Sequence, residues 1–222
     1  MKNFILITFI ALLFISCKQK PKTRIAQPDL SIADKIANAH GFENWKNVTE
    51  IQFTFNVDRD SSHFERTWNW KPKTNDVVMM TTKDTVTYNR KSIDSLSMRA
   101  DQGFINDKFW LLVPFQLVWD EGTTISNPIK TEAPISKTEI NKITLTYSNN
   151  GGYTPGDAYD LFYTDDFLIK EWIFRKGNQK EPSMITSFEN HQDFKGIKIA
   201  LEHKKQGENW NLNFTNIKVT LE

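Results

Sequence analysis

The chain has one cysteine in 222 residues, Cys17, and this scarcity excludes several classes of protein. Without a second cysteine, no disulfide can link two parts of the chain, and a zinc site built on paired thiolates cannot form. The histidines also lack a second His or Cys at the short spacing that zinc ligands show. They are His40, His63, His191 and His203. We therefore expect neither a metal site nor a cofactor.

An excess of charge of one sign is absent as well. The chain holds 28 Lys and Arg residues against 27 Asp and Glu residues. A nucleic-acid partner requires a basic surface, so we expect no nucleic-acid binding. The Gly-x-Ser-x-Gly motif of serine hydrolases is missing, and the glycine-rich segment 150–156 lacks the Lys-Ser/Thr pair of a phosphate-binding loop. We expect this segment to be a mobile loop and the protein not to be an enzyme.

Long apolar runs are scarce too, and the main one covers residues 4–15. A membrane-spanning helix needs about 20 apolar residues, so this run is too short to cross a bilayer. It follows the basic Lys2 and is typical of the hydrophobic part of a secretory signal peptide. The run ends in Ser16-Cys17, which resembles the lipobox of bacterial lipoproteins, although Phe14 stands where Leu is usual. The resemblance implies that residues 1–16 are a signal peptide and that Cys17 carries acyl chains such as palmitate.

The next residues, 18–28, are basic, polar and punctuated by proline. We interpret residues 17–28 as the lipidated cysteine and a flexible tether, with contact between its positive charges and anionic headgroups as an alternative. Lys18, rather than Asp, directly after the cysteine favours the outer membrane by the rule known for lipoproteins. The expected location is therefore the cell envelope, with a single domain over residues 29–222 facing the periplasm.

The periodicity of this domain predicts a mainly β fold with few helices. A helix should begin near Ser31, with Asp34 in its first turn, and stop at Gly41. From residue 51 to 57 apolar and polar residues alternate, and residues 64–70 form a second strand of the same hairpin. About ten such strands indicate a curved antiparallel sheet or an incomplete β-barrel. Pro114 should end a short helix over 106–112 and leave an extended segment after it.

Two stretches carry a resemblance to a known group of proteins. The first is Ala39-His40-Gly41 with Trp45, and the second runs from Asn106-Asp107 through Phe109–Phe115 to Trp119–Gly122. Together they resemble an uncharacterised family of gram-negative envelope lipoproteins with a domain of unknown function. That family is distantly similar to the lipoprotein-sorting proteins of the LolA and LolB type. The resemblance implies an incomplete antiparallel barrel with a helical plug, lined with side chains that receive acyl chains.

Aromatic residues are the main candidates for a binding site, because ligand pockets are mostly apolar. We expect a lipid or acyl chain to bind beneath the Pro114 segment, although each ring could also belong to the core. The candidate ligand-binding residues are Trp68, Trp70, Phe109, Trp110, Phe115 and Trp119, together with the more distant Trp172 and Trp210.

Two alternative functions stay open at this point. The first is a non-enzymatic scaffold with a filled core that binds protein partners. The second is a hydrolase that uses a pair of carboxylates, since two acids at a suitable separation can act as acid and base. The carboxylates considered are Asp107, Asp120, Glu121, Asp157, Asp160, Asp165 and Asp166.

Overall fold

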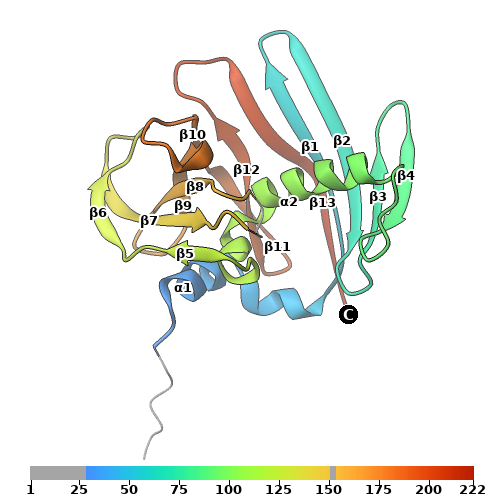
Figure 1. The fold of residues 1–222 in the computed structure, drawn as a ribbon, viewed down its shortest axis with the longest axis horizontal. Helices are drawn as coiled ribbons and strands as arrows, with labels where there is room; N and C mark the ends of the chain where they lie inside the picture. The colour runs from blue at the N-terminus through green and yellow to red at the C-terminus, as the bar shows by residue number, and fades with distance from the viewer. Residues whose placement is uncertain (1–28, 151–153) are drawn as a thin grey trace, which may run out of the picture.

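The structure is a computed structural model that describes residues 29–150 and 154–222 (Figure 1). The expected signal peptide, the lipidation of Cys17 and the tether lie outside the described residues, as does the centre of the glycine-rich loop. None of the described helices combines the length and the hydropathy that crossing a bilayer requires.

The N-terminal helix α1, Ile32–Ala39, begins where the sequence predicts. The Ser31 hydroxyl accepts a hydrogen bond from the Asp34 backbone N–H at 3.1 Å, and the Asp34 carboxylate accepts one from the Ser31 N–H at 3.2 Å. This reciprocal pair satisfies donors that the first helical turn leaves free. Gly41 follows with a φ of +90°, and a short 3₁₀ helix, Phe42–Asn47, leads into the first strand.

Seven strands form the larger sheet, in the order β11-β12-β13-β1-β2-β3-β4, and every neighbouring pair is antiparallel. The alternation at residues 51–57 belongs to its central strand, and the predicted hairpin with the second strand is confirmed. The strands are β1 Val48–Arg59, β2 Ser62–Lys71, β3 Asp76–Met80, β4 Thr85–Asn89, β11 Glu189–Phe194, β12 Ile197–Lys204 and β13 Trp210–Leu221.

A smaller antiparallel sheet has the order β10-β9-β8-β7-β5, with β6 also paired to β7. The two sheets do not close into a barrel, so the expected class, a mainly β fold built as an incomplete barrel, is confirmed. The strands are β5 Thr123–Ile125, β6 Ile129–Glu132, β7 Glu139–Tyr147, β8 Ala158–Tyr163, β9 Ile169–Arg175 and β10 Met184–Ser187, and a 3₁₀ turn, Lys176–Asn178, follows β9.

The long helix α2, Met98–Trp119, corrects the prediction for the middle of the chain. The helix continues past Pro114, so the expected extended segment is wrong. Its backbone breaks at Leu112, where φ is −128° and ψ is 30°. The break places Pro114 in the first turn of a new helical segment, where the missing N–H has no helical partner to lose. Burial of the residues around Pro114 then holds this segment in place.

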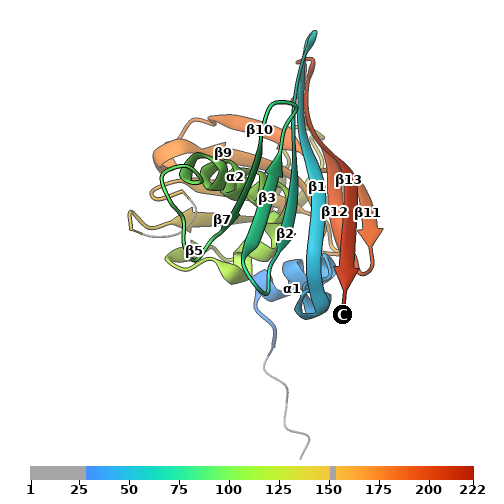
Figure 2. The same ribbon diagram turned by 90° about the vertical axis from the view of Figure 1, so that its right-hand side faces the viewer.

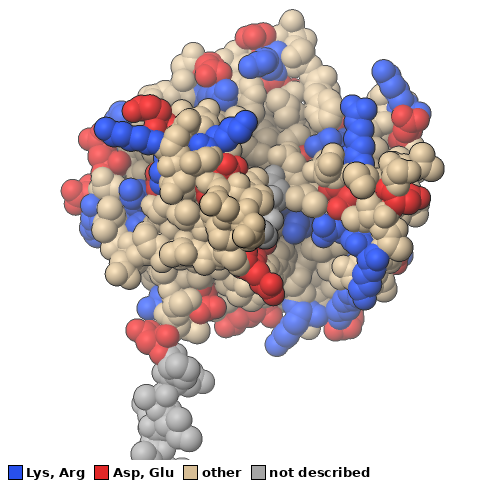
Figure 3. All heavy atoms as spheres, viewed as in Figure 1, with Lys and Arg blue, Asp and Glu red and all other residues tan. Residues whose placement is uncertain are grey.

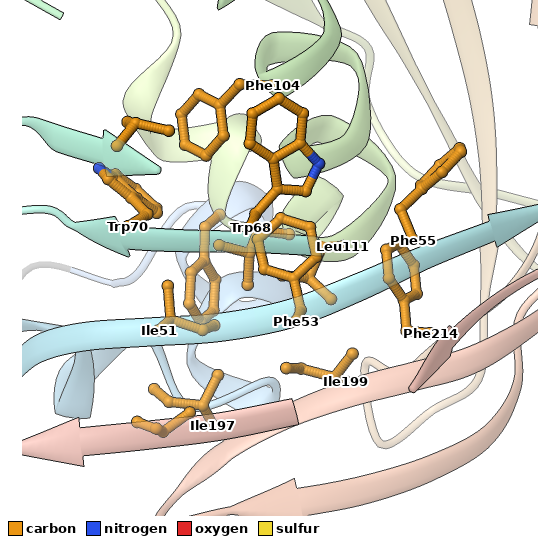
Figure 4. Close-up of a cluster of buried hydrophobic side chains, with 14 of the residues drawn as sticks. Ile51, Phe53, Phe55, Trp68, Trp70, Phe104, Leu111, Ile197, Ile199 and Phe214 are labelled. Carbon is orange, nitrogen blue, oxygen red and sulfur yellow. The ribbon is translucent and has the colours of Figure 1, made fainter. Parts of the chain in front are cut away.

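Helix α2 lies between the two sheets and fills the space that they partly enclose (Figures 1 and 2). On one side, Phe104, Leu111 and Phe115 join the core of the larger sheet. On the other side, Phe109, Val113 and Leu117 join the core of the smaller sheet. Figure 4 shows Phe104 lying over the rings of Trp68 and Trp70. The expected helical plug is therefore present, and it packs apolar side chains against both sheets.

Candidate ligand-binding site

A buried polar cluster fixes the orientation of α2 against the larger sheet. Asp107 is completely buried, and Arg66 Nη2 and Trp68 Nε1 donate to its two carboxylate oxygens at 2.6 and 2.7 Å. Burial raises the pKa of Asp107, whereas the hydrogen bonds and the charge of Arg66 act in the opposite direction. The Arg66 guanidinium passes close to the helix at Gly103, where a Cβ would lie 2.7 Å from Nη1. These contacts determine which face of α2 turns toward the smaller sheet.

The face of α2 that turns toward the smaller sheet borders a pocket of about 180 Å³ against β8, β9 and β10. The closest ring contacts are Trp110 with Trp172, at 4.4 Å between centroids, and Phe109 with Tyr159, at 5.0 Å. Tyr159 also stacks on Phe174 at 5.1 Å. The walls are therefore mainly aromatic. The lining residues are Asn106, Phe109, Trp110, Thr154, Tyr159, Trp172, Phe174 and Met184.

The volume of this pocket limits what can enter. Sites for drug-sized ligands usually measure about 300–1,000 Å³, whereas an apolar cavity of about 150 Å³ is large enough for benzene. The pocket of about 180 Å³ thus has room for one ring or a short alkyl segment. A complete long acyl chain does not fit into it in this structure.

The expected binding residues fall into separate groups in the structure. Phe109, Trp110 and Trp172 meet at the pocket. Trp68 and Trp70 pack on Phe104 in the core of the larger sheet, at 5.4 and 5.3 Å.

The remaining expected residues lie elsewhere. Phe115 and Trp119 gather with Trp45 at the C-terminal end of α2, where the Trp45–Trp119 distance is 5.1 Å. Trp210 lies 6.5 Å from Trp110. Pro114 and its neighbours Val113 and Phe115 are themselves buried.

Five pocket residues are absent from the sequence-based list: Asn106, Thr154, Tyr159, Phe174 and Met184. Phe174 shares the alternation of Trp172 along β9, which would have placed both on one face. Tyr159 and Met184 come from neighbouring strands, and their positions follow from the strand pairing, in which Phe174 lies opposite both. That register connects segments far apart in sequence, and local patterns do not determine it.

Two of the acidic residues considered for catalysis, Asp160 and Asp120, are engaged in hydrogen bonds within the fold. Asp160 accepts from Thr144 Oγ1 at 2.6 Å and pairs with Arg175 at 3.1 Å. Asp120 accepts from the Tyr147 hydroxyl at 2.5 Å. Among residues 29–150 and 154–222, no group of three or more His, Cys, Asp or Glu side chains is placed to hold a metal ion.

The structure also places His40 and the surface charges. His40 Nδ1 donates to the Ile36 carbonyl at 3.1 Å, a hydrogen bond at the C-terminal end of α1. Figure 3 shows both signs of charge spread over the face in view.

Comparisons with known proteins give a likeness in fold only. No family model matches the chain, and no curated protein matches its sequence. Several solved structures are similar to it in fold, including the following three. A DUF1329 family protein from Desulfovibrio piger has 8% identity and a TM-score of 0.45, over 85% of this chain and 91% of that one.

The other two are a LolA superfamily protein from Nitrosomonas europaea and a domain named for outer-membrane lipoprotein sorting from Vibrio parahaemolyticus. The first has 12% identity and a TM-score of 0.49 over 86% of this chain and 94% of its own. The second has 9% identity and a TM-score of 0.48 over 85% of this chain and 91% of its own. The expected likeness to such proteins is found among solved structures. At these values it assigns no ligand or activity to the chain.

Proposed function

We propose that this protein is a lipid-anchored envelope protein whose β-rich domain binds a small apolar molecule, or a short apolar part of a lipid, in the pocket beside Trp110. The pocket's mainly aromatic walls carry this proposal. Each CH₂ group that leaves water there contributes about 0.8 kcal/mol to binding. The carboxylates of Asp107 and Asp120 are engaged in hydrogen bonds within the fold, which favours binding over catalysis by this pair.

Met184 offers a direct way to test binding, because its side chain lines the pocket. The full chain, reconstituted in lipid nanodiscs with ¹³C-labelled methionine methyl groups, is titrated with toluene. We expect a saturable shift of the Met184 methyl resonance and none of the half-buried Met79, which lies in β3. A Met184→Leu variant assigns the signal. If Met184 does not respond up to the solubility limit of toluene, the proposal is wrong.

The anchor is tested at Cys17. We propose that this residue holds the protein at the outer membrane, with the domain in the periplasm. A Cys17→Ser variant should leave the membrane fraction and appear in the soluble periplasmic fraction, whereas a Ser16→Ala variant, which keeps the cysteine, should stay membrane-bound. Equal membrane association of Cys17→Ser and the unmodified chain would contradict the lipid anchor.

A second function, that of an interaction protein with a filled interior, is favoured by one observation. Helix α2 packs against the cores of both sheets and leaves room for only a small molecule. Absence of any Met184 response, together with an intact fold, would favour this second function.

A further inference from the structure

Two large apolar side chains are exposed close to the point where the described chain begins. Leu30, just before α1, is 51% exposed, and Ile129, the first residue of β6, is 52% exposed. Single exposed apolar residues are common on protein surfaces, whereas a contiguous apolar surface marks an interaction site. The neighbours of these two side chains therefore decide what they mean.

A shared hollow joins the surroundings of both side chains. It measures about 510 Å³ and brings together α1, the segment before β6 and the turn between β8 and β9. Ile32 and Pro128 line it, and they stand two positions after Leu30 and directly before Ile129. The half-buried ring of Phe167 adds a further apolar wall. Leu30 and Ile129 thus border apolar surface that three separate segments contribute.

This surface lies at the end of the domain that is connected to the expected lipid anchor. In both views α1 lies at the lower end of the domain, and the described chain enters it there at Asp29 (Figures 1 and 2). Only residues 18–28 separate Cys17 from this point, and such a segment spans at most about 40 Å when fully extended. An anchor at Cys17 therefore keeps this end of the domain close to the membrane.

Charge of one sign does not dominate the surface. Lys35 Nζ lies 3.3 Å from the Asp29 carboxylate, so the two charges offset each other. Asp165 borders the hollow and accepts a hydrogen bond from Asn141 at 2.9 Å. Attraction to anionic headgroups is therefore not the main force expected here. A contact made by apolar side chains should persist at salt concentrations that screen exposed charges.

We propose that the tether-end surface, formed by Leu30, Ile129 and the hollow between their neighbours, rests on the phospholipid surface of the membrane that holds Cys17. The inference rests on the proposed lipid anchor. Apolar side chains that enter the boundary between headgroups and acyl chains stabilise such a contact in proportion to the area they bury. The contact orients the domain, with the turn between β1 and β2 at the end away from the membrane (Figure 2).

The test reads contact with lipid at one labelled position at a time. The full chain is reconstituted in vesicles of phosphatidylethanolamine and phosphatidylglycerol whose acyl chains carry a nitroxide quencher, and an environment-sensitive fluorophore is attached to an introduced cysteine. Asn127→Cys reports on the tether-end surface, because Asn127 is exposed and lines the hollow. Ser61→Cys reports on the turn between β1 and β2, and Ser95→Cys on the segment between β4 and α2. We expect quenching at Asn127→Cys alone.

A matched pair of variants shows which side chains make the contact. In the Asn127→Cys background, Ile129→Asp should lower the quenching to the level of Ser61→Cys. Phe64→Asp, at a ring that is 47% exposed in β2, should leave it unchanged, as should added sodium chloride. Equal quenching at Asn127→Cys and Ser61→Cys, or no effect of Ile129→Asp, would overturn the proposal. So would stronger quenching at Ser95→Cys, because the contact would then belong to Leu96, which is 85% exposed.

The unmodified chain separates a failure of this surface from a failure of the anchor. Its only thiol is that of Cys17, which acylation blocks, so the chain should take up no fluorophore and should float with the vesicles. If it takes up fluorophore or stays behind, the proposed anchor is wrong and the inference falls with it. If it floats unlabelled while Asn127→Cys is not quenched, the anchor stands and the tether-end surface is wrong.

Discussion

Arg66 on β2 and Asp107 on α2 form an ion pair whose carboxylate is completely shielded from solvent. Arg66 donates to Asp107 through two nitrogens, so the pair has the two-pronged geometry that fixes direction as well as distance. The contact joins the larger sheet to the helix that forms one wall of the pocket. We therefore expect the pocket to depend on this pair, although neither residue lines it.

Replacing Arg66 with Met should strongly destabilise the fold, because it leaves a buried charge without its partner. The expected loss is about 3–5 kcal/mol in the free energy of unfolding, measured by urea denaturation. Lys73→Met is the matched control, since Lys73 forms an exposed pair with Glu222. Its effect should stay below about 1 kcal/mol. Equal losses in the two variants would show that the Arg66–Asp107 pair does not hold α2.

Gly41 provides a second test of the fold at the junction of α1 with the larger sheet. Its φ is +90°, and an added Cβ would lie 1.8 Å from the Gly196 carbonyl oxygen. Gly41→Ala must therefore displace backbone in addition to adopting a strained conformation. At Gly207 φ is +75° and the surroundings are open, so Gly207→Ala carries the strain alone, about 1–2 kcal/mol. We expect a clearly larger fall in melting temperature for Gly41→Ala, and equal falls would contradict the close packing at Gly196.

The stability of the fold should decrease as the pH falls below neutral. Burial lowers the pKa of His40 and of His203 to about 3 each, from an ordinary value near 6.5. Between these values the unfolded chain binds protons that the folded chain does not, so acid favours unfolding. Each histidine contributes a slope of up to about 1.4 kcal/mol per pH unit between pH 6.5 and 3.

Urea unfolding at a series of pH values measures how the free energy of unfolding changes with pH. His40→Gln should make this dependence weaker, because it removes one of the two buried histidines. His63→Gln should not, because exposed His63 has its pKa raised by a hydrogen bond to Asp58, and its protonation therefore acts in the opposite direction. A free energy of unfolding that is constant from pH 6.5 to 4 would mean that the buried histidines do not titrate as the structure implies.

Local sequence patterns predicted the helices and strands that are determined by residues close together in the sequence. Ser31 and Asp34 lie three residues apart and form their capping pair within one helical turn. The alternation in β1 marks a strand with one face toward the core. Local patterns did not predict the break at Leu112. Contacts with the cores of both sheets stabilise α2 beyond Pro114, and these contacts involve residues distant in sequence.

The site was predicted only in part, for a related reason. The sequence singled out Phe109, Trp110 and Trp172 by their aromatic character, and these rings meet at the pocket. The parts of the wall formed by Met184 and Tyr159 depend on how β10 and β8 pair with β9. Ring composition alone did not separate Trp68, which is a core residue, from Trp110, which borders the pocket.

We propose that the pocket beside Trp110 holds an apolar molecule in the native protein. Native mass spectrometry of the full chain, extracted from its own membrane, shows whether such a molecule is bound. The unmodified protein should carry a small bound molecule that is released on denaturation. Trp110→Asp should lack it, whereas the control Phe64→Asp, at an exposed ring, should retain it. A bare mass for the unmodified protein, or identical occupancy in Trp110→Asp, would contradict binding of an apolar molecule in this pocket.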